Sequence, residues 1–275
     1  MVQKNLLATI LINNFNNNRF INKCVLSCIS QSYKNIEIII YDDFSNDGSE
    51  KYLKKIKHKN IKKIFNKKKL SKSGPINQFE AIEKAFLKSK GEFIFLLDSD
   101  DFFLKDKVRY FVNLFRKNKN LEFIQDNPIY FYPIQNTKRK KLIKNKKFVM
   151  HTWPYFNPTS TMVFKRKFFS KLIKEIYFSK RKYKKMYFDA RAMIYIYFFC
   201  KNFKTSEKYL TVYTQNIQGD TIKNYKNMNI GWWERRLEYH KFVEMLFYKK
   251  NKIHIKLIDY YFTHFLNWVR KNLKF

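Results

Sequence analysis

Three aspartates stand close together in the segment Asp98-Ser99-Asp100-Asp101, directly after the apolar run Phe93–Leu97. Carboxylates at such short spacing repel one another unless a cation neutralises them. Oxygen ligands of this kind suit Mg²⁺ or Mn²⁺, which commonly bridge carboxylates and the phosphate oxygens of a substrate. The alternative is that Asp98 or Asp101 caps a following helix while the other carboxylates are solvated.

Two more polar clusters follow apolar runs in the same way. Asn13-Asn14-Phe15 comes after Leu6–Ile12, and Asp42-Asp43 comes after Ile36–Tyr41. The amides of the two asparagines, the phenyl ring of Phe15 and the two carboxylates together could bind a polar ligand. Asp side chains also cap turns, however, and that alternative fits Asp42 better than Asp43.

Helical patterns separate the apolar runs. They cover Arg19–Gln31, Ser49–Lys57 and a segment opened by Pro75, a residue favoured in the first turn of a helix. Continuously apolar strands that alternate with helices predict an α/β fold with a Rossmann-like, mostly parallel sheet flanked by helices. Ligands bind at the carboxyl ends of the strands in such sheets, so we expect the three polar clusters to meet at one site.

The pattern changes after about residue 120. The basic stretch Thr137–Lys147 predicts an exposed loop, and Asp189–Phe199 is apolar nearly all round, which predicts a buried helix. The other expected elements are strands at Ile61–Phe65, Leu121–Asp126, Ile129–Ile134, Thr161–Phe164 and Lys208–Tyr213, and aromatic-rich helices at Trp232–Phe247 and Ile255–Leu273.

The composition excludes some classes of protein and leaves others open. Hydrophobic residues make up 45% of the 275 residues, which excludes a wholly disordered chain, and three Cys cannot form a disulfide framework. The 57 Lys and Arg against 22 Asp and Glu give a net charge of +35, which attracts nucleic acid, anionic lipid and phosphorylated molecules. The abundance of Lys, Asn, Ile, Phe and Tyr also fits adenine- and thymine-rich codons, which would scatter lysines over the surface without a partner.

No segment has the roughly 20 apolar residues that a membrane-spanning helix needs. The short apolar run Leu6–Ile12 is followed by an asparagine-rich stretch, where a signal peptide would have small residues and a cleavage site. We therefore expect a cytoplasmic protein.

The combined motifs resemble family 2 glycosyltransferases of the GT-A fold. The family's "Q-S/T-Y-x-N-x-E-I-I-I-x-D-D-x-S-x-D-G-S" stretch corresponds to Gln31–Ser49, and its "G-E-(apolar)-L-D-x-D-D" stretch, which holds the DXD motif, corresponds to Gly91–Asp101. The resemblance implies a GT-A domain over residues 1–220, with a nucleotide-sugar-binding half (1–120) and an acceptor half (121–220). Residues 221–275 would form a C-terminal helical extension.

The resemblance also implies roles for individual residues. Asn13, Asn14, Phe15 and Asp43 would bind the nucleotide of the sugar donor, with Phe15 stacked on the base and Asp43 accepting its ring N–H. Asp98 and Ser99 would lie near the ribose, and Asp98 and Asp100 would hold Mg²⁺ or Mn²⁺. The alternative for Phe15 is an aromatic residue buried in the core.

Asp189 is the expected catalytic base. Phe188-Asp189-Ala190-Arg191 is similar to an acidic motif that begins a buried helix in the family, and a carboxylate in a first turn is kept ionised by the helix dipole. Its alternatives are a helix cap or an ion pair with Arg191. Asp126 and Glu175 are weaker candidates for the base.

The sequence departs from the family pattern at several positions. Gln78 stands near a position where members often have Arg, so Lys69 and Lys72 would neutralise the phosphates instead. No His follows the strand at Lys208–Tyr213, and Asp220 would contribute there. The segment Trp153–Thr161 would form the acceptor wall, and the alternative for Trp153 is a position in the core.

The resemblance therefore implies an inverting, metal-assisted glycosyltransferase of polysaccharide biosynthesis. It would move a sugar from a nucleoside-diphosphate sugar to a hydroxyl of a saccharide or lipid-linked acceptor, without binding specific nucleic acid. A basic nucleic-acid-binding protein and a nucleotidyltransferase are the alternatives; acidic clusters at the strand ends oppose the first, and the lack of a glycine-rich phosphate loop opposes the second.

Residues 230–275 leave three interpretations open. Their helices cover the catalytic domain, lie on the inner face of a membrane, or form a homodimer.

Overall fold

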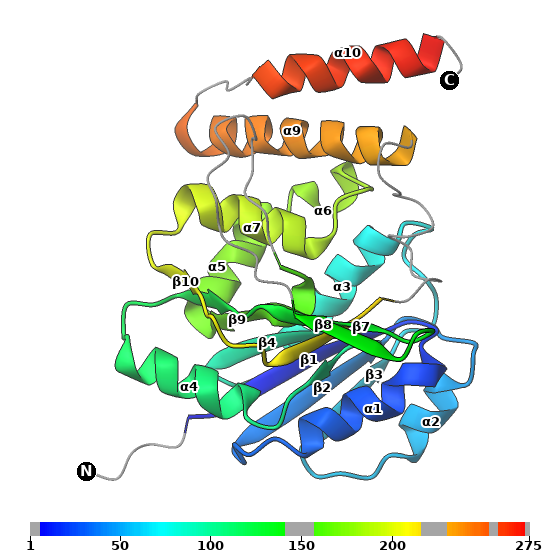
Figure 1. Cartoon of the computed structure of the whole chain (residues 1–275), viewed down its shortest axis with the longest axis vertical. Coiled ribbons are helices and arrows are strands. Elements are labelled where there is room, and N and C mark those ends of the chain that lie inside the picture. The colour runs from blue at the N-terminus through cyan, green and yellow to red at the C-terminus, as the bar shows by residue number, and fades with distance from the viewer. Residues whose placement is uncertain (1–5, 141–156, 216–229, 253–257, 273–275) are drawn as a thin grey trace.

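The computed structural model describes residues 6–140, 157–215, 230–252 and 258–272, and its centre is a seven-stranded sheet (Figure 1). The strand order is β10-β6-β9-β4-β1-β2-β3. The strands are β1 (Ala8–Asn14), β2 (Ile36–Asp42), β3 (Ile61–Phe65), β4 (Phe93–Asp98), β6 (Phe123–Gln125), β9 (Met162–Lys165) and β10 (Phe203–Thr205).

Strands β4, β1, β2 and β3 are parallel, as the alternation of apolar runs and helices predicts. In their register Asn13 lies opposite Asp98 on β4, and Asn14 lies opposite Asp42 on β2. The three polar clusters therefore meet at one edge of the sheet. The exception to the parallel arrangement is β9, which is antiparallel to both β4 and β6.

Helices cover both faces of this sheet (Figure 1). Because successive side chains of a strand point to opposite faces, Ile10 and Ile12 of β1 join one hydrophobic cluster and Leu11 joins the other. The first face is covered by α1 (Asn18–Ile29), α2 (Ser49–Lys55) and α4 (Lys107–Lys117), and the second by α3 (Gly74–Leu87), α5 (Arg166–Ile176), α6 (Ser179–Lys182) and α7 (Phe188–Phe199). Helix α7 is buried, as predicted.

A second, four-stranded sheet corrects one prediction. Its order is β5 (Phe102–Phe103), β11 (Thr211–Thr214), β7 (Pro128–Tyr132) and β8 (Thr137–Lys140). Thr137–Lys140 was expected to be loop but pairs with β7 in antiparallel fashion. All four of its side chains are exposed, so the strand rests on backbone pairing and leaves no apolar pattern in the sequence. Residues 141–147 of the expected loop lie outside the described residues.

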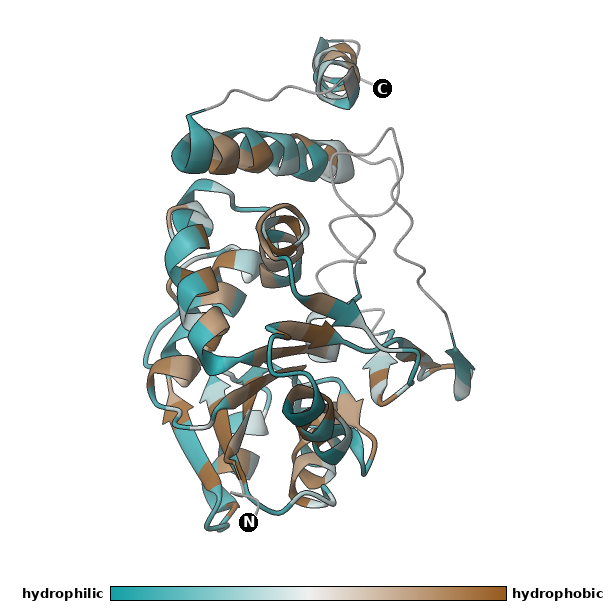
Figure 2. Cartoon of the chain, turned by 90° about the vertical axis from the view of Figure 1, so that its left-hand side faces the viewer, coloured by the Kyte–Doolittle hydropathy of each residue, from teal (hydrophilic) through white to brown (hydrophobic). Residues whose placement is uncertain are grey.

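The C-terminal helices are α9 (Ile230–Asn251) and α10 (Ile258–Asn272). Phe242, Val243 and Leu246 of α9 are buried in the same cluster as α7, so this helix does cover the domain, which confirms that interpretation for α9. Helix α10 lies on the far side of α9 from the sheet (Figures 1 and 2). In the described part of the chain, no helix is both long and apolar enough to cross a bilayer.

Candidate active site

The carboxylate of Asp98 is held at the edge of the sheet by two side-chain amides. Asn13 Nδ2 donates to Asp98 Oδ1 at 2.7 Å, and Gln78 Nε2 of α3 donates to the same oxygen at 3.2 Å. Burial raises the pKa of Asp98, and the two amides oppose that shift by stabilising the charged form. The carboxylate is therefore fixed in direction while its residue remains partly exposed.

The other two aspartates of the turn differ from each other. Asp101 is buried and turned inward: its carboxylate accepts from Ser160 Oγ at 2.5 Å and from the backbone N–H of Thr214 at 2.7 Å. Asp100 is partly exposed. Burial and the nearby charges of Asp100 and Asp98 raise the pKa of Asp101. Ser99 is also buried, and its hydroxyl accepts from Asn17 Nδ2 at 2.7 Å.

These residues suit a divalent cation that shares its ligands with a substrate. Over the described ranges, no three or more His, Cys, Asp or Glu side chains are grouped to hold a metal by themselves. Mg²⁺ sites, however, commonly use one or two carboxylates and take the rest from phosphate oxygens. Asp98 and Asp100 supply such carboxylates, and Asn13 Oδ1 is a buried oxygen that accepts no hydrogen bond from a described residue.

Asn14 and Asp42 build the turn at the end of β2. Asn14 is buried, and its Nδ2 donates to Asp42 Oδ1 at 2.6 Å and to the hydroxyls of Ser45 and Ser49. Asp42 also accepts from the backbone N–H of Ser45 at 3.0 Å, which is the turn-capping contact expected for it. The side chain of Asn14 is therefore used by the turn, and its backbone carbonyl accepts from the N–H of Asp43.

Phe15 and Asp43 lie in the adjacent loops. The Phe15 ring is 40% exposed, which excludes the alternative of a buried core aromatic, and Lys69 Nζ lies 3.2 Å from the centroid of the ring. Asp43 is buried and accepts from Asn66 Nδ2 at 3.0 Å. Burial raises the pKa of Asp43, while Asn66 and the charge of Lys69 oppose the shift. An open ring, a carboxylate and a cation thus share this end of the site.

Asp189 lies in the first turn of α7, where its Oδ1 accepts from the Ala190 N–H at 2.7 Å. Burial raises its pKa to about 6, and the charge of Asp98 adds to the shift. The charges of Arg235, from α9, and Arg191 act in the opposite direction. The charge of Asp98 therefore acts on the pKa of Asp189.

Gln78 joins the two carboxylate positions. Its Nε2 donates to Asp98, and its Oε1 accepts the backbone N–H of Phe188 at 3.0 Å, one residue before Asp189. One side chain of α3 therefore fixes the end of β4 relative to the start of α7. The sequence marks Gln78 only as a departure from a family pattern.

Tyr213 of β11, which the sequence did not single out, precedes Thr214, whose N–H donates to Asp101. Burial raises the pKa of Tyr213 well above the ordinary value, and the charges of Asp101, Asp100, Asp98 and Asp189 raise it further. Its ring packs edge-on against Tyr130 at 5.6 Å. Tyr213 is the last residue of the predicted strand Lys208–Tyr213, and that position could have indicated that it lies near the site.

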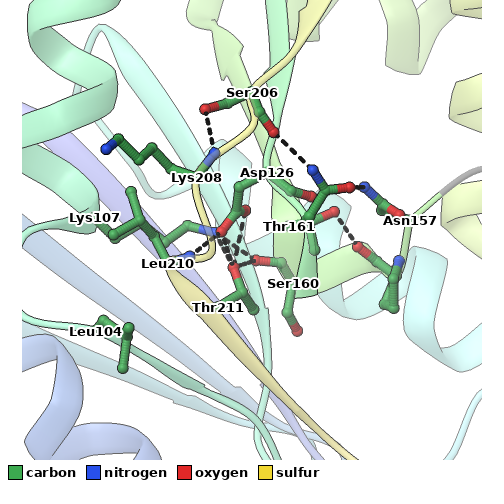
Figure 3. Close-up of polar contacts among 12 residues, drawn as sticks. Leu104, Lys107, Asp126, Asn157, Ser160, Thr161, Ser206, Lys208, Leu210 and Thr211 are labelled. Carbon is green, nitrogen blue, oxygen red and sulfur yellow. Dashed lines mark hydrogen bonds and ion pairs between the residues drawn. The ribbon is translucent and has the colours of Figure 1, made fainter. Parts of the chain in front are cut away.

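The two rival bases lie elsewhere. Asp126 is fully buried and pairs with Lys107 Nζ at 2.8 Å, while Thr211 and the Leu210 N–H also donate to it (Figure 3). Burial raises the pKa of Asp126 and lowers that of Lys107, and their mutual attraction opposes both shifts. Glu175 of α5 pairs with Lys250 at 2.5 Å. Both carboxylates serve the fold.

The remaining expected residues are placed as follows. Arg191 is buried and its Nη2 donates to the carbonyls of Ser179 and Tyr183; the contacts described for Asp189 include no ion pair with it. Lys72 is exposed. Trp153 and Asp220 lie outside the described residues.

The family model of Glycosyl transferase family 2 matches residues 9–185, which contain Asp98, Gln78 and the turns described above. The chain belongs to this family. Two curated relatives are an uncharacterised glycosyltransferase of Haemophilus influenzae, 35% identical over 116 residues, and UDP-Glc:alpha-D-GlcNAc-diphosphoundecaprenol beta-1,3-glucosyltransferase WfgD of Escherichia coli, 28% identical over 147 residues. The matches cover 41% and 50% of this chain and 43% and 56% of the relatives, so the chain spans about half the length of the curated relatives it matches.

Solved structures confirm the expected GT-A fold. S. aureus TarS (residues 1–349) in complex with UDP-GlcNAc has a TM-score of 0.62 at 14% identity, covering 97% of this chain and 73% of that one. Mannosyltransferase PcManGT of Pyrobaculum calidifontis, in complex with GDP-Man and Mn2+, has a TM-score of 0.52 at 13% identity, covering 96% of this chain and 69% of that one. Family membership argues against both alternatives, the nucleic-acid-binding protein and the nucleotidyltransferase.

Proposed function

We propose that this protein is an inverting glycosyltransferase that moves a sugar from a nucleoside-diphosphate sugar to a hydroxyl acceptor. The observation that carries the proposal is the juxtaposition of Asp98 and Asp189 through Gln78. One carboxylate lies where a donor diphosphate is held in parallel sheets, and the other can take a proton. The matched family model covers residues 9–185, which include Asp98, and Asp189 follows four residues beyond the matched range.

The donor is proposed to lie between the Phe15–Asp43 end of the site and the end of β4. The exposed ring of Phe15 offers a stacking face for a base, and the buried carboxylate of Asp43 offers an acceptor for a ring N–H. Lys69, next to both, supplies a positive charge for the diphosphate. Because WfgD is named for UDP-Glc, a UDP-hexose is the donor we propose first.

Asp98 and Asp100 would hold Mg²⁺ or Mn²⁺, with Asn13 Oδ1 as a further oxygen beside them. When bound, the cation supplies the charge that stabilises the departing nucleoside diphosphate. Asn13 and Gln78 keep Asp98 oriented by their bonds to Oδ1. Asp101, turned inward to Ser160 and Thr214, stabilises the turn that presents Asp100.

Asp189 is proposed to accept the proton of the acceptor hydroxyl. A pKa of about 6 leaves most of the side chain ionised at neutral pH, yet keeps it basic enough to bind a proton. A single base and a single displacement at the anomeric carbon invert its configuration. The partial burial of Asp189 limits competing water around it.

A lipid-linked saccharide is the acceptor we propose first, since WfgD of E. coli is named for transfer to a diphosphoundecaprenol-linked sugar. Within this proposal residues 1–120 bind the donor and residues 121–220 form the acceptor half. Residues 221–275 form the helical extension.

Donor and metal binding provide the test. Calorimetric titration of a panel of nucleoside-diphosphate sugars, with and without Mn²⁺, should reveal one that binds only when the cation is present. Asp100→Ala should abolish this metal-dependent binding. Asp106→Ala, which removes an exposed carboxylate from the same segment, is the matched control and should bind as the wild type does. Unchanged binding by Asp100→Ala would reject the metal assignment.

A further inference from the structure

Helix α10 presents its apolar side to the solvent. The side chains of Tyr261, Phe262, Phe265 and Trp268 are 60%, 56%, 58% and 59% exposed. Tyr261, Phe265 and Trp268 follow the three- and four-residue spacing of one helical face. A helix on a globular surface ordinarily turns such a face inward. Helix α10 has the opposite orientation, with its aromatic face exposed and the polar residues Thr263 and Asn267 buried.

Polar contacts fix α10 in this orientation. Arg236 Nη2 of α9 donates to both carboxylate oxygens of Asp259, at 2.6 and 2.5 Å. Thr263 is fully buried, and its Oγ1 lies 3.3 Å from Nε2 of His240, within hydrogen-bonding distance. Asn267, 7% exposed, donates to the carbonyl oxygen of Trp233 at 3.1 Å. Specific hydrogen bonds therefore hold the polar face against α9 and leave the aromatic face outside.

The C-terminal segment carries an excess of basic residues. Residues 230–275 contain ten Lys and Arg but four Asp and Glu. The one acidic residue of α10, Asp259, is paired with Arg236 on the inner side. The aromatic face therefore has no carboxylate of its own helix beside it, and an anionic surface can approach it without repulsion from α10.

We propose that the outward aromatic face of α10 docks on the surface of a bilayer that contains anionic phospholipid. Tyr and Trp side chains are favoured at the boundary between headgroups and acyl chains, and the net charge of +35 adds attraction to anionic lipid. The helix lies on the bilayer rather than across it. A second copy of the chain is the weaker occupant, because two molecules of net charge +35 repel each other.

This surface is connected to the candidate site through α9. The helix that holds α10 by Arg236 also carries Arg235, whose charge acts on Asp189. A bilayer touching α10 would therefore lie on the side of the molecule where α9 meets the proposed catalytic base. The docking proposal rests on α10 itself and stands or falls independently of the transferase activity.

Vesicle flotation with the full chain tests the proposal. Vesicles of phosphatidylcholine mixed with phosphatidylglycerol should carry the protein upward, and those of phosphatidylcholine alone should carry less. Phe265→Ser combined with Trp268→Ser should lower the partition coefficient at least about tenfold, since both side chains are proposed to enter the boundary. The control, Leu87→Ser with Ile134→Ser, removes apolar residues that are 72% and 70% exposed elsewhere and should partition as the wild type does.

Circular dichroism and sedimentation velocity accompany the flotation. Unchanged helix content in the Phe265/Trp268 variant shows that the loss of binding is not a loss of fold. Equal binding by that variant and the wild type would overturn the proposal, because scattered lysines would then account for the attraction. A wild-type dimer that the same two substitutions dissociate would also overturn it, by showing that a second copy covers the face.

Discussion

Asp189 and Asp126 show how the surroundings of a carboxylate decide what it can do. Asp126 is fully buried, with Lys107, Thr211 and a backbone N–H bound to it, so its charge is fully used by the fold. Asp189 has one hydrogen bond to the first turn of its own helix and stands near a second carboxylate, Asp98. Asp126 is therefore a structural ion, whereas Asp189 can exchange a proton near neutral pH.

The pKa of about 6 gives a pH prediction for Asp189. A base works only when ionised, so kcat/KM should rise with pH and level off above about pH 6. Asp189→Asn should lower turnover by about 10²–10⁴-fold and remove this acidic limb, with donor affinity near that of the wild type. Glu175→Gln removes a carboxylate that pairs with Lys250 and serves as the control for turnover.

The same shift predicts the effect on stability. A carboxyl whose pKa is raised from 3.8 to about 6 in the folded state binds its proton more tightly there than in the unfolded chain. Its contribution to stability is therefore fully present below pH 3.8 and is lost as the pH rises through about 6. Asp189→Asn should not lower Tm at pH 8. A large loss of Tm with turnover within a few-fold of wild type would assign Asp189 to the fold.

Among the elements, the strands that carry the site were the most predictable. Ile61–Phe65 has the expected bounds, and β1, β2 and β4 each end one or two residues beyond their apolar runs, while β1 also begins two residues later than expected. Those extra residues are polar: Asn13 and Asn14 end β1, and Asp98 ends β4. Apolar content marks where a buried strand runs, but the polar residues at its carboxyl end belong to the strand as well.

Other elements had weaker signals. Helix α4 was not predicted, although Val108, Phe111, Val112 and Phe115 follow helical spacing and are buried, so its pattern was available. The edge strand β8 has no apolar residue, and β10 is too short for a period to be seen. The contact of Gln78 with Phe188 joins positions 110 residues apart, and nothing periodic in the sequence indicates it.

The buried pair of Lys107 and Asp126 joins α4 to the residue that follows β6, and Thr211 of β11 binds the same carboxylate, which gives a prediction at this scale. Lys107→Met should lower the free energy of unfolding by about 3–5 kcal/mol, because it leaves Asp126 charged and uncompensated in the interior. Asp126→Asn added to that variant should recover part of the loss. Lys105→Met, at an exposed position two residues away, is the control. Urea denaturation gives all four values, and a loss below about 1 kcal/mol would mean that the pair adds little.

For the whole molecule, three groups of helices lie in different places around the central sheet. One face of the sheet is covered by α1, α2 and α4, the other carries α3 and α7 with Gln78 and Asp189, and α9 and α10 lie beyond α7 (Figure 1). The net charge of +35 follows from the sequence, but the sequence does not show which surface of the protein that charge would serve. The reversed orientation of α10 became visible only when Thr263 and Asn267 were found on the inner side.

Inversion at the anomeric carbon is the central feature of the proposed reaction, and it can be measured without knowing the acceptor. With the nucleoside-diphosphate sugar selected by calorimetry, water should replace the acceptor and the bound donor should hydrolyse slowly. Proton NMR during the first turnovers, before the free sugar equilibrates, should show a β-sugar released from an α-linked donor. Asp189→Asn should suppress that signal. An α-sugar appearing first would contradict inverting transfer with Asp189 as its base.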